Sequence, residues 1–143
     1  MTTHQPDPVI FGEAHLSIEQ VVALSQRQAR AQLQDDAAYR EKIAKGARFL
    51  DTLLDKEGVI YGVTTGYGDS CTVVVPPDLV AELPHHLYTY HGCGAGRFLD
   101  AEQTRAVLAT RLASLCQGVS GVSVDLLLQL EGLLRHDILP LIP

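Results

Sequence analysis

Asp100-Ala-Glu-Gln-Thr-Arg-Ala-Val-Leu-Ala-Thr-Arg-Leu-Ala-Ser-Leu115 carries both a helix start and a helical apolar period. Asp100 can accept from the first free backbone N–H groups, and Gln103 stands at the spacing of a capping box. The apolar residues on one side of the predicted helix are Val107, Leu108, Leu112 and Leu115. The stretch therefore predicts an amphipathic helix that turns one face toward a core.

Helices are also expected before and after this stretch. Ser17 begins a helix with Gln20 at the capping-box spacing, and its apolar residues carry it to about Leu33. Asp35 and Asp36 precede a second helix. That helix has apolar residues at steps of three or four (Tyr39, Ile43, Ala47, Leu50 and Leu54) and ends at Gly58.

Two more helices complete the predicted set. One begins at Pro77, is bent by Pro84, and ends in the glycine cluster after His91. The other begins at Ser123. Its residues expected to face the core are Leu126, Leu127, Leu130, Leu133 and Leu134. With one short extended piece at Val9 to Phe11, the prediction is a mainly α, helical domain over residues 1–143, with Gly-rich loops between helices.

Composition excludes several classes of protein. A hydrophobic content of 46% with 20% charged residues is ordinary for a globular chain and argues against disorder. The net charge is −6, and no run of Lys and Arg suggests a basic face, which argues against a nucleic-acid partner. No apolar run is long enough to span a membrane, and the polar start resembles no secretory signal, so we expect a cytoplasmic protein.

The three cysteines, Cys71, Cys93 and Cys116, are odd in number and widely spaced. No CxxC pair suggests a metal site, and an odd count argues against a disulfide framework. We therefore expect three buried free thiols and no metal.

Chemistry is expected first in the loop Ile60-Tyr-Gly-Val-Thr-Thr-Gly-Tyr-Gly-Asp69. Glycine lets a backbone turn sharply or approach a ligand closely, and a phenol beside such a turn can act as a base at a pocket mouth. Tyr61 is the candidate. The alternative is a simple turn in which Tyr61 and Tyr67 pack together. A phosphate-binding loop is excluded because the GxxxxGK[ST] pattern is absent.

A second glycine-rich segment, Gly92 to Gly96, follows Tyr88, Tyr90 and His91. His91 is either a pocket residue or an ordinary histidine at a helix end. His85 and His86 fit a solvated helix face. A thiol–imidazole nucleophile made of Cys93 and His91 is disfavoured, because no third residue is placed to orient the pair.

Four ordered segments resemble the histidine and aromatic amino-acid ammonia-lyases. Tyr61 to Gly68 is similar to their tyrosine loop, Tyr-Gly-x-Asn/Thr-Thr-Gly-Phe-Gly. Leu87 to Gly96 resembles their substrate-pocket segment, Leu-x-x-Ser-His-x-x-Gly-x-Gly. Arg111 to Leu115 with Gly118 to Val122 resembles their helix junction, and Asp137 to Pro143 resembles the apolar run that closes their N-terminal part.

The resemblance covers roughly residues 9 to 143 and implies a mechanism. These enzymes use 4-methylideneimidazol-5-one, an electrophile formed from an internal Ala-Ser-Gly triplet. A tyrosine at the position of Tyr61 removes the β-proton, and ammonia leaves to give an α,β-unsaturated acid. The resemblance places Gly68 near the substrate through its backbone, and His91 and Tyr90 beside the substrate's side chain. It also implies a homotetramer.

Some positions depart from the family pattern. Tyr67 replaces the common Phe, and Tyr90-His91-Gly92-Cys93 replaces Ser-His-Ala-Ala, which favours tyrosine over histidine as substrate. The chain contains no Ala-Ser-Gly triplet, which the resemblance places just beyond Pro143. We therefore expect an N-terminal segment that is inactive alone and needs the rest of its polypeptide, or a second chain, for the cofactor. The alternatives are a 2,3-aminomutase with the same cofactor and a catalytically inactive helical binding domain.

Overall fold

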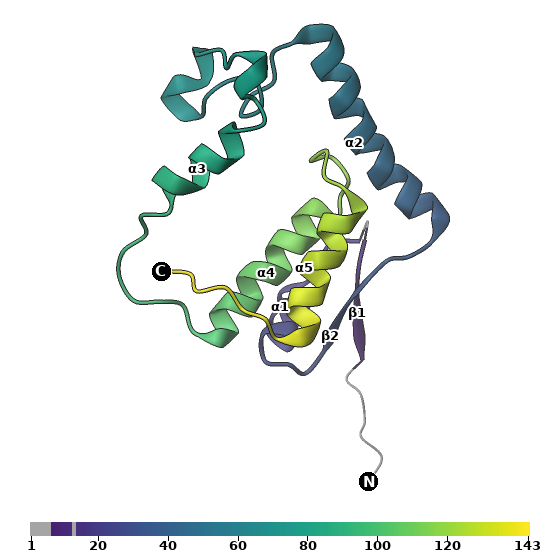
Figure 1. The fold of residues 1–143 in the computed structure, drawn as a ribbon. Helices are drawn as coiled ribbons and strands as arrows, with labels where there is room; N and C mark the ends of the chain where they lie inside the picture. Colours follow the sequence, from purple (N-terminus) through teal and green to yellow (C-terminus); the bar gives the residue numbers. More distant parts are fainter. Residues whose placement is uncertain (1–6, 13) are drawn as a thin grey trace. The chain divides into compact units, whose positions relative to one another are not determined.

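A computed structural model describes residues 7–12 and 14–143, and these residues form two compact units (Figure 1). The first unit comprises the described residues of Met1–Arg48 together with Arg97–Pro143, and the second is Phe49–Gly96. Among the described residues, five α-helices and one two-stranded sheet confirm the prediction of a mainly α protein. No helix in the described part of the chain combines the length and apolar character needed to cross a membrane.

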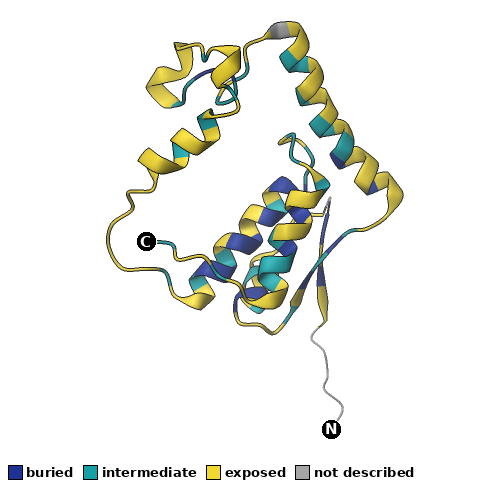
Figure 2. Ribbon diagram, viewed as in Figure 1, coloured by how far each residue is buried: buried dark blue, intermediate teal, exposed yellow. Residues whose placement is uncertain are grey.

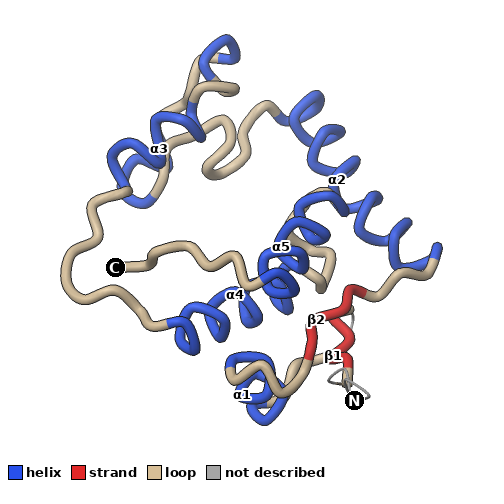
Figure 3. The backbone as a smooth tube through the Cα atoms, turned by 60° about the horizontal axis from the view of Figure 1, so that its bottom comes forward, coloured by secondary structure: helices blue, strands red, loops and turns tan. Residues whose placement is uncertain are grey.

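The first unit opens with a β-α-β arrangement. Strand β1 (Pro8–Phe11) and strand β2 (Arg30–Leu33) are parallel, with helix α1 (Ile18–Ser25) between them (Figure 3). Alternate residues of the two strands are buried: Val9 and Phe11 from one, Ala31 and Leu33 from the other. The small sheet therefore buries one face against the helices of its unit.

The predicted helix from Ser17 to Leu33 is wrong in its second half. Helix α1 ends at Ser25, and Arg27 adopts a left-handed backbone conformation (φ 61°) that helical residues do not adopt. The chain then turns and pairs with β1 at the register Pro8 to Arg30. This pairing joins segments some twenty residues apart, which a local apolar period cannot reveal.

The predicted helix starts are confirmed at three positions. Ser17 accepts from the backbone N–H of Gln20, and the Gln20 side chain accepts from the Ser17 N–H in return. Asp100 and Gln103 form the same reciprocal pair at the start of α4 (Ala101–Leu115), and Ser123 caps α5 (Val124–His136). Each cap satisfies donors that the first helical turn leaves free.

Helix α2 (Ala37–Glu57) also matches its prediction. Asp36 accepts from the backbone N–H of Tyr39 at 2.8 Å and from the Gln34 side chain at 2.6 Å. These two bonds, the one from Gln34 foremost, lower the pKa of the Asp36 carboxyl group, since they favour its charged form. Asp36 thereby fixes the beginning of the helix.

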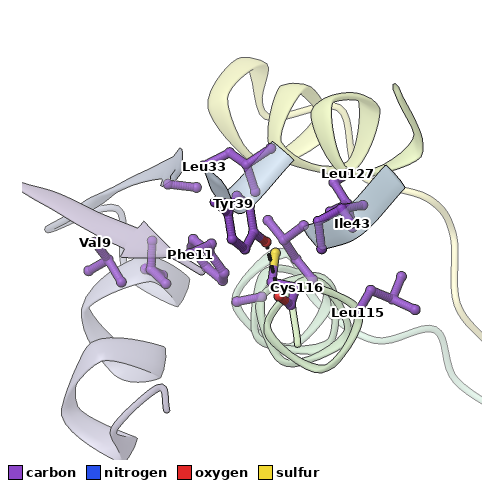
Figure 4. Close-up of a cluster of buried hydrophobic side chains, with 12 residues drawn as sticks. Val9, Phe11, Leu33, Tyr39, Ile43, Leu115, Cys116 and Leu127 are labelled. Carbon is purple, nitrogen blue, oxygen red and sulfur yellow. Dashed lines mark hydrogen bonds between the residues drawn. The ribbon is translucent and has the colours of Figure 1, made fainter. Parts of the chain in front are cut away.

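The core of the first unit lies where α1, α4 and α5 meet the sheet and the first turns of α2 (Figure 4). Phe11, Ile43, Leu112 and Leu127 are fully buried there. The Tyr39 hydroxyl donates to the backbone carbonyl of Cys116 at 3.0 Å and so remains satisfied inside the core. On α5, however, Leu126 is 38% exposed, which contradicts its predicted place in the core.

The second unit is built from short elements. After α2 it contains two 3₁₀ segments, η1 (Gly68–Thr72) and η2 (Pro77–Leu79), and then helix α3 (Leu83–His91). The helix predicted from Pro77 with a bend at Pro84 is therefore wrong at its start. Pro84 lies in the first turn of α3, where its missing N–H costs nothing, so it begins a helix instead of bending one.

The prediction of three buried thiols holds only for Cys116. Burial raises the pKa of that thiol, and a hydrogen bond with Tyr39 offsets the shift only in part, so the group stays neutral at pH 7. Cys71 and Cys93 are exposed. Cys93 lies within the glycine-rich segment Gly92 to Gly96, and Cys71 follows the tyrosine loop. Both belong to the second unit, in which most residues are exposed (Figure 2).

Candidate active site

The loop that carries Tyr61 is held by its own threonines. The Thr64 hydroxyl accepts from the backbone N–H of Ile60 at 2.7 Å, and the Thr65 hydroxyl accepts from that of Gly62 at 3.2 Å. Both threonines are buried. Such side-chain bonds to backbone close a turn that neither a helix nor a sheet supports.

The far side of the loop is held by a short antiparallel bridge. Gly66 N–H donates to the Val73 carbonyl at 3.1 Å, and Val75 N–H donates to the Thr64 carbonyl at 2.8 Å. These bonds close the intervening segment, which contains η1, into a loop. This arrangement fixes the middle of the tyrosine loop, Thr64 to Gly66, against the residues that follow η1.

Within this frame, the Tyr61 oxygen has a defined partner. The backbone N–H of Gly68 donates to it at 3.0 Å, and the Tyr61 and Tyr67 rings meet edge to face with centroids 6.2 Å apart. An N–H can only donate, so the phenol oxygen accepts here and is placed to accommodate negative charge. Tyr61 is nevertheless 64% exposed, so these residues do not exclude water from it.

Gly62 is required for this packing. Its φ of 70° lies in the left-handed region, and a Cβ added there would approach Cε1 of Tyr67 to 2.6 Å. Gly68, with φ 56°, has open space around it, so only its backbone conformation favours glycine. The close approach at Gly62 explains why the loop begins Tyr-Gly.

Thr65→Val should loosen the loop without changing its shape. Valine keeps the volume but leaves the Gly62 N–H without its acceptor, which costs about 1–3 kcal/mol for a buried group. We expect amide hydrogen exchange at Gly62 to accelerate by about tenfold or more. Thr65→Ser restores the hydroxyl and should keep the slow exchange. Equal exchange in Thr65→Val and the unchanged chain would show that this hydroxyl does not hold the turn.

The second predicted group lies at the end of α3. The Tyr90 and His91 rings contact each other with centroids 4.9 Å apart, and both residues are exposed. Tyr88 instead pairs with His85, at 2.9 Å from its hydroxyl to Nδ1, which places His85 in a local helix-surface contact. Cys93 Sγ lies against the Tyr90 carbonyl, not against an imidazole, so no thiol–imidazole pair forms.

The structure thus brings the predicted site residues into two pairs. Tyr61 contacts Gly68, and Tyr90 contacts His91. Among the described residues, no hydrogen bond or ring contact joins one pair to the other. No described group of three or more His, Cys, Asp and Glu residues is placed to hold a metal ion.

Two residues that hold the loop, Thr64 and Thr65, received no role from the sequence. The sequence nevertheless contains an indication of this role, because a threonine next to a glycine in a loop often bonds to nearby backbone groups. The partner of such a bond depends on the turn that forms. Only the folded loop shows that Thr64 binds Ile60 and Thr65 binds Gly62.

Comparison with known proteins identifies the family. Residues 16–143 match the family model described as aromatic amino acid lyase. The chain belongs to this family. The aromatic amino acid lyase resemblance seen in the four sequence segments is thereby confirmed.

Among curated aromatic amino acid lyases, the histidine ammonia-lyase of Streptococcus gordonii is 30% identical over 129 residues, which are 90% of this chain and 25% of that protein. The histidine ammonia-lyase of Staphylococcus aureus is 31% identical over 128 residues. The chain therefore spans about a quarter of the length of the curated relatives it matches.

Solved structures agree in fold. The tyrosine aminomutase of Streptomyces globisporus matches with a TM-score of 0.86 and 30% identity over 95% of this chain and 26% of that one. The ergothionase of Treponema denticola, an ergothioneine-degrading enzyme, matches with a TM-score of 0.86 and 27% identity, over 96% of this chain and 27% of that one. The chain therefore shares its arrangement of elements with enzymes that carry different names.

Proposed function

We propose that this chain is the N-terminal segment of an aromatic L-amino-acid ammonia-lyase, in which Tyr61 removes the substrate's β-proton. The observation that carries the proposal is the bond from the Gly68 N–H to the Tyr61 oxygen, inside a loop pinned by two buried threonines. A general base must be held in position, and negative charge on its oxygen must find a donor. Family membership supports the same reading.

The base alone does not suffice for this reaction. A β-C–H bond is very weakly acidic, so an electron-withdrawing group must act on the substrate, and in this family we expect 4-methylideneimidazol-5-one to supply that chemistry. The chain contains no Ala-Ser-Gly triplet, so its residues cannot form the group. We propose that the remaining polypeptide, or a second chain, supplies it and covers the exposed Tyr61.

We propose an aromatic amino acid as substrate, with tyrosine favoured over histidine. Tyr90 and His91 form a paired aromatic and imidazole surface that suits a polar or phenolic ring. The similarity to a tyrosine aminomutase points the same way, whereas the two curated relatives described above are histidine ammonia-lyases. Gly68 would contact the substrate through its backbone.

A 2,3-aminomutase is the second candidate. The tyrosine aminomutase of Streptomyces globisporus shares 30% identity and a TM-score of 0.86 with this chain. An aminomutase would use the same tyrosine and return ammonia to the β-carbon. Product analysis separates the two activities, because a lyase releases an unsaturated acid and a mutase a β-amino acid.

The assembled protein is also proposed to be a cytoplasmic homotetramer that binds neither nucleic acid nor membrane. Large apolar side chains are uncovered in the chain as described, among them Phe49 at 65% exposure and Val119 at 86%. Apolar surface of this kind is commonly buried on assembly.

The experiment supplies histidine, tyrosine and phenylalanine to two samples, the 143-residue chain alone and the chain combined with the polypeptide that carries the triplet. We expect urocanate, coumarate or cinnamate absorbance only from the combined sample, with tyrosine turned over fastest. Turnover by the isolated chain would overturn its proposed inactivity. Neither unsaturated acid nor β-amino acid from the combined sample would instead favour a binding domain without catalytic activity.

A further inference from the structure

Four of the eight arginines of the chain line one pocket of about 320 Å³ in the first unit. Arg27 lies in the connection between α1 and β2, and Arg30 is the first residue of β2. Arg105 lies on α4, and Arg135 and His136 lie at the end of α5. Figure 1 shows the C-terminal end of α5 beside the connection between α1 and β2. The fold thus gathers cationic side chains that the sequence disperses between positions 27 and 136.

One arginine of this set, Arg105, is held in place by hydrogen bonds. The Arg105 side chain is only 10% exposed, its Nε donates to the Ser25 carbonyl, and its Nη1 donates to Asp137 at 2.8 Å. The other oxygen of Asp137 lies 3.3 Å from the Arg27 guanidinium. A single carboxylate therefore bridges two arginines and holds both at the pocket.

The bridge joins the C-terminal ends of two helices, α1 and α5. Arg27 and Asp137 are the only non-glycine residues in the described part of the chain with positive φ, at 61° and 56°. Each directly follows the last turn of a helix, α1 or α5, where a left-handed residue commonly ends the helix. Both left-handed residues belong to the same bridge at the pocket.

The charges at the pocket do not cancel. Arg135 pairs with Glu131 at 3.6 Å, and the Arg30 guanidinium has no hydrogen bond or ion pair with any described residue. Among the described residues, four arginines line the pocket and two carboxylates contact them, which leaves two positive charges in excess. This excess stands out in a chain whose net charge is −6.

The helix ends near the pocket lower its positive electrostatic potential. The C-terminal ends of α1 and α5 reach the pocket, and their free carbonyls carry partial negative charge. Arg105 already donates to the Ser25 carbonyl, and Arg135 and His136 occupy the last turn of α5. The Arg30 guanidinium, which pairs with no described residue, is the cationic group that these contacts leave for a ligand.

We propose that this pocket binds the phosphate group of a small molecule. Guanidinium forks match phosphate oxygens in pairs, and a phosphate dianion balances the two excess positive charges, which a single carboxylate would not. The volume is at the small end of the range for ligand pockets and holds a phosphate with a short organic group. This site is independent of Tyr61 and of the lyase activity proposed above.

The test is a titration of the 143-residue chain followed by amide NMR at constant ionic strength. Inorganic phosphate, glycerol 3-phosphate and acetate are the three probes. We expect saturable shifts at Arg27 to Ala31 and at Arg135 to Asp137 with phosphate, with a dissociation constant on the order of 1 mM or tighter. Acetate should bind at least about tenfold more weakly. Tighter binding of glycerol 3-phosphate than of phosphate assigns the site to phosphate monoesters, whereas equal binding assigns it to free phosphate.

Arg30→Gln tests the site directly, because the Arg30 side chain is exposed and bonds to no described residue, so we expect the variant to fold. The variant should weaken phosphate binding by about fivefold or more and reduce the rise in Tm that phosphate causes. Arg111→Gln, an exposed arginine of α4 outside the pocket, removes the same charge and should change neither. No saturable shift at the pocket, or equal losses in the two variants, would overturn the proposal.

Discussion

Tyr61→Phe in the assembled lyase is expected to lower kcat by about 100- to 10,000-fold while leaving KM within about threefold. Phenylalanine keeps the ring that meets Tyr67 edge to face but removes the oxygen that accepts from the Gly68 N–H. The proton acceptor is lost and the loop packing is kept. Steady-state kinetics of product absorbance measure the effect.

Tyr67→Phe is the matched control, since it makes the same chemical change six positions further along the same loop. Phe is also the common residue at this position in the lyases that the loop resembles, so we expect kcat within about threefold of the unchanged enzyme. Near-normal turnover in Tyr61→Phe would remove Tyr61 from the mechanism. Equal losses in both variants would assign the effect to the packing of the two rings.

Leu127→Ala is expected to lower the free energy of unfolding of the first unit by about 2–5 kcal/mol. Leu127 is fully buried between α5 and the rest of the core, so alanine leaves a cavity that its neighbours fill only in part (Figure 4). Because a domain is commonly stable by only about 5–15 kcal/mol, this single change should shift the urea midpoint strongly.

Leu128→Ala changes its neighbour on the same helix and removes the same atoms from a residue that is 38% exposed. We expect a loss below about 1 kcal/mol, within the range for partly exposed positions. If Leu127→Ala proves too unstable to measure, Leu127→Met keeps the volume and should cost less than about 1.5 kcal/mol. Similar losses at Leu127 and Leu128 would contradict the face of α5 assigned to the core.

Much of the helical architecture could be predicted because its signals are local. The caps at Ser17, Asp100 and Ser123 act on backbone groups three residues away, and all three form. The apolar steps of α2 likewise place Tyr39 and Ile43 in the core. An interaction within one turn of helix joins residues that are close in the sequence, so the sequence alone is enough to predict it.

The errors arise where distant segments compete with a local pattern. The run from Arg30 to Leu33 fits a helix period and also a strand period, and only its pairing with Pro8–Phe11 selects the strand. At the other error, Pro84, the sequence marks a break but does not say whether a helix bends or begins there. The predicted place of Leu126 in the core is wrong because the apolar residues of a helix do not show how much of its surface the neighbouring elements cover.

For the candidate site, the residues alone made the tyrosine loop a candidate and left a simple turn open, and the resemblance of four segments identified its family. The fold added the Gly68 donor and the two threonine hydroxyls that hold the loop, since each bond depends on the turn that forms. Likewise, Arg27 and Arg105 meet at Asp137 only because α4, α5 and the connection before β2 converge. Sequence determines what acts between near neighbours along the chain, and folding decides which distant charges come within reach of one another.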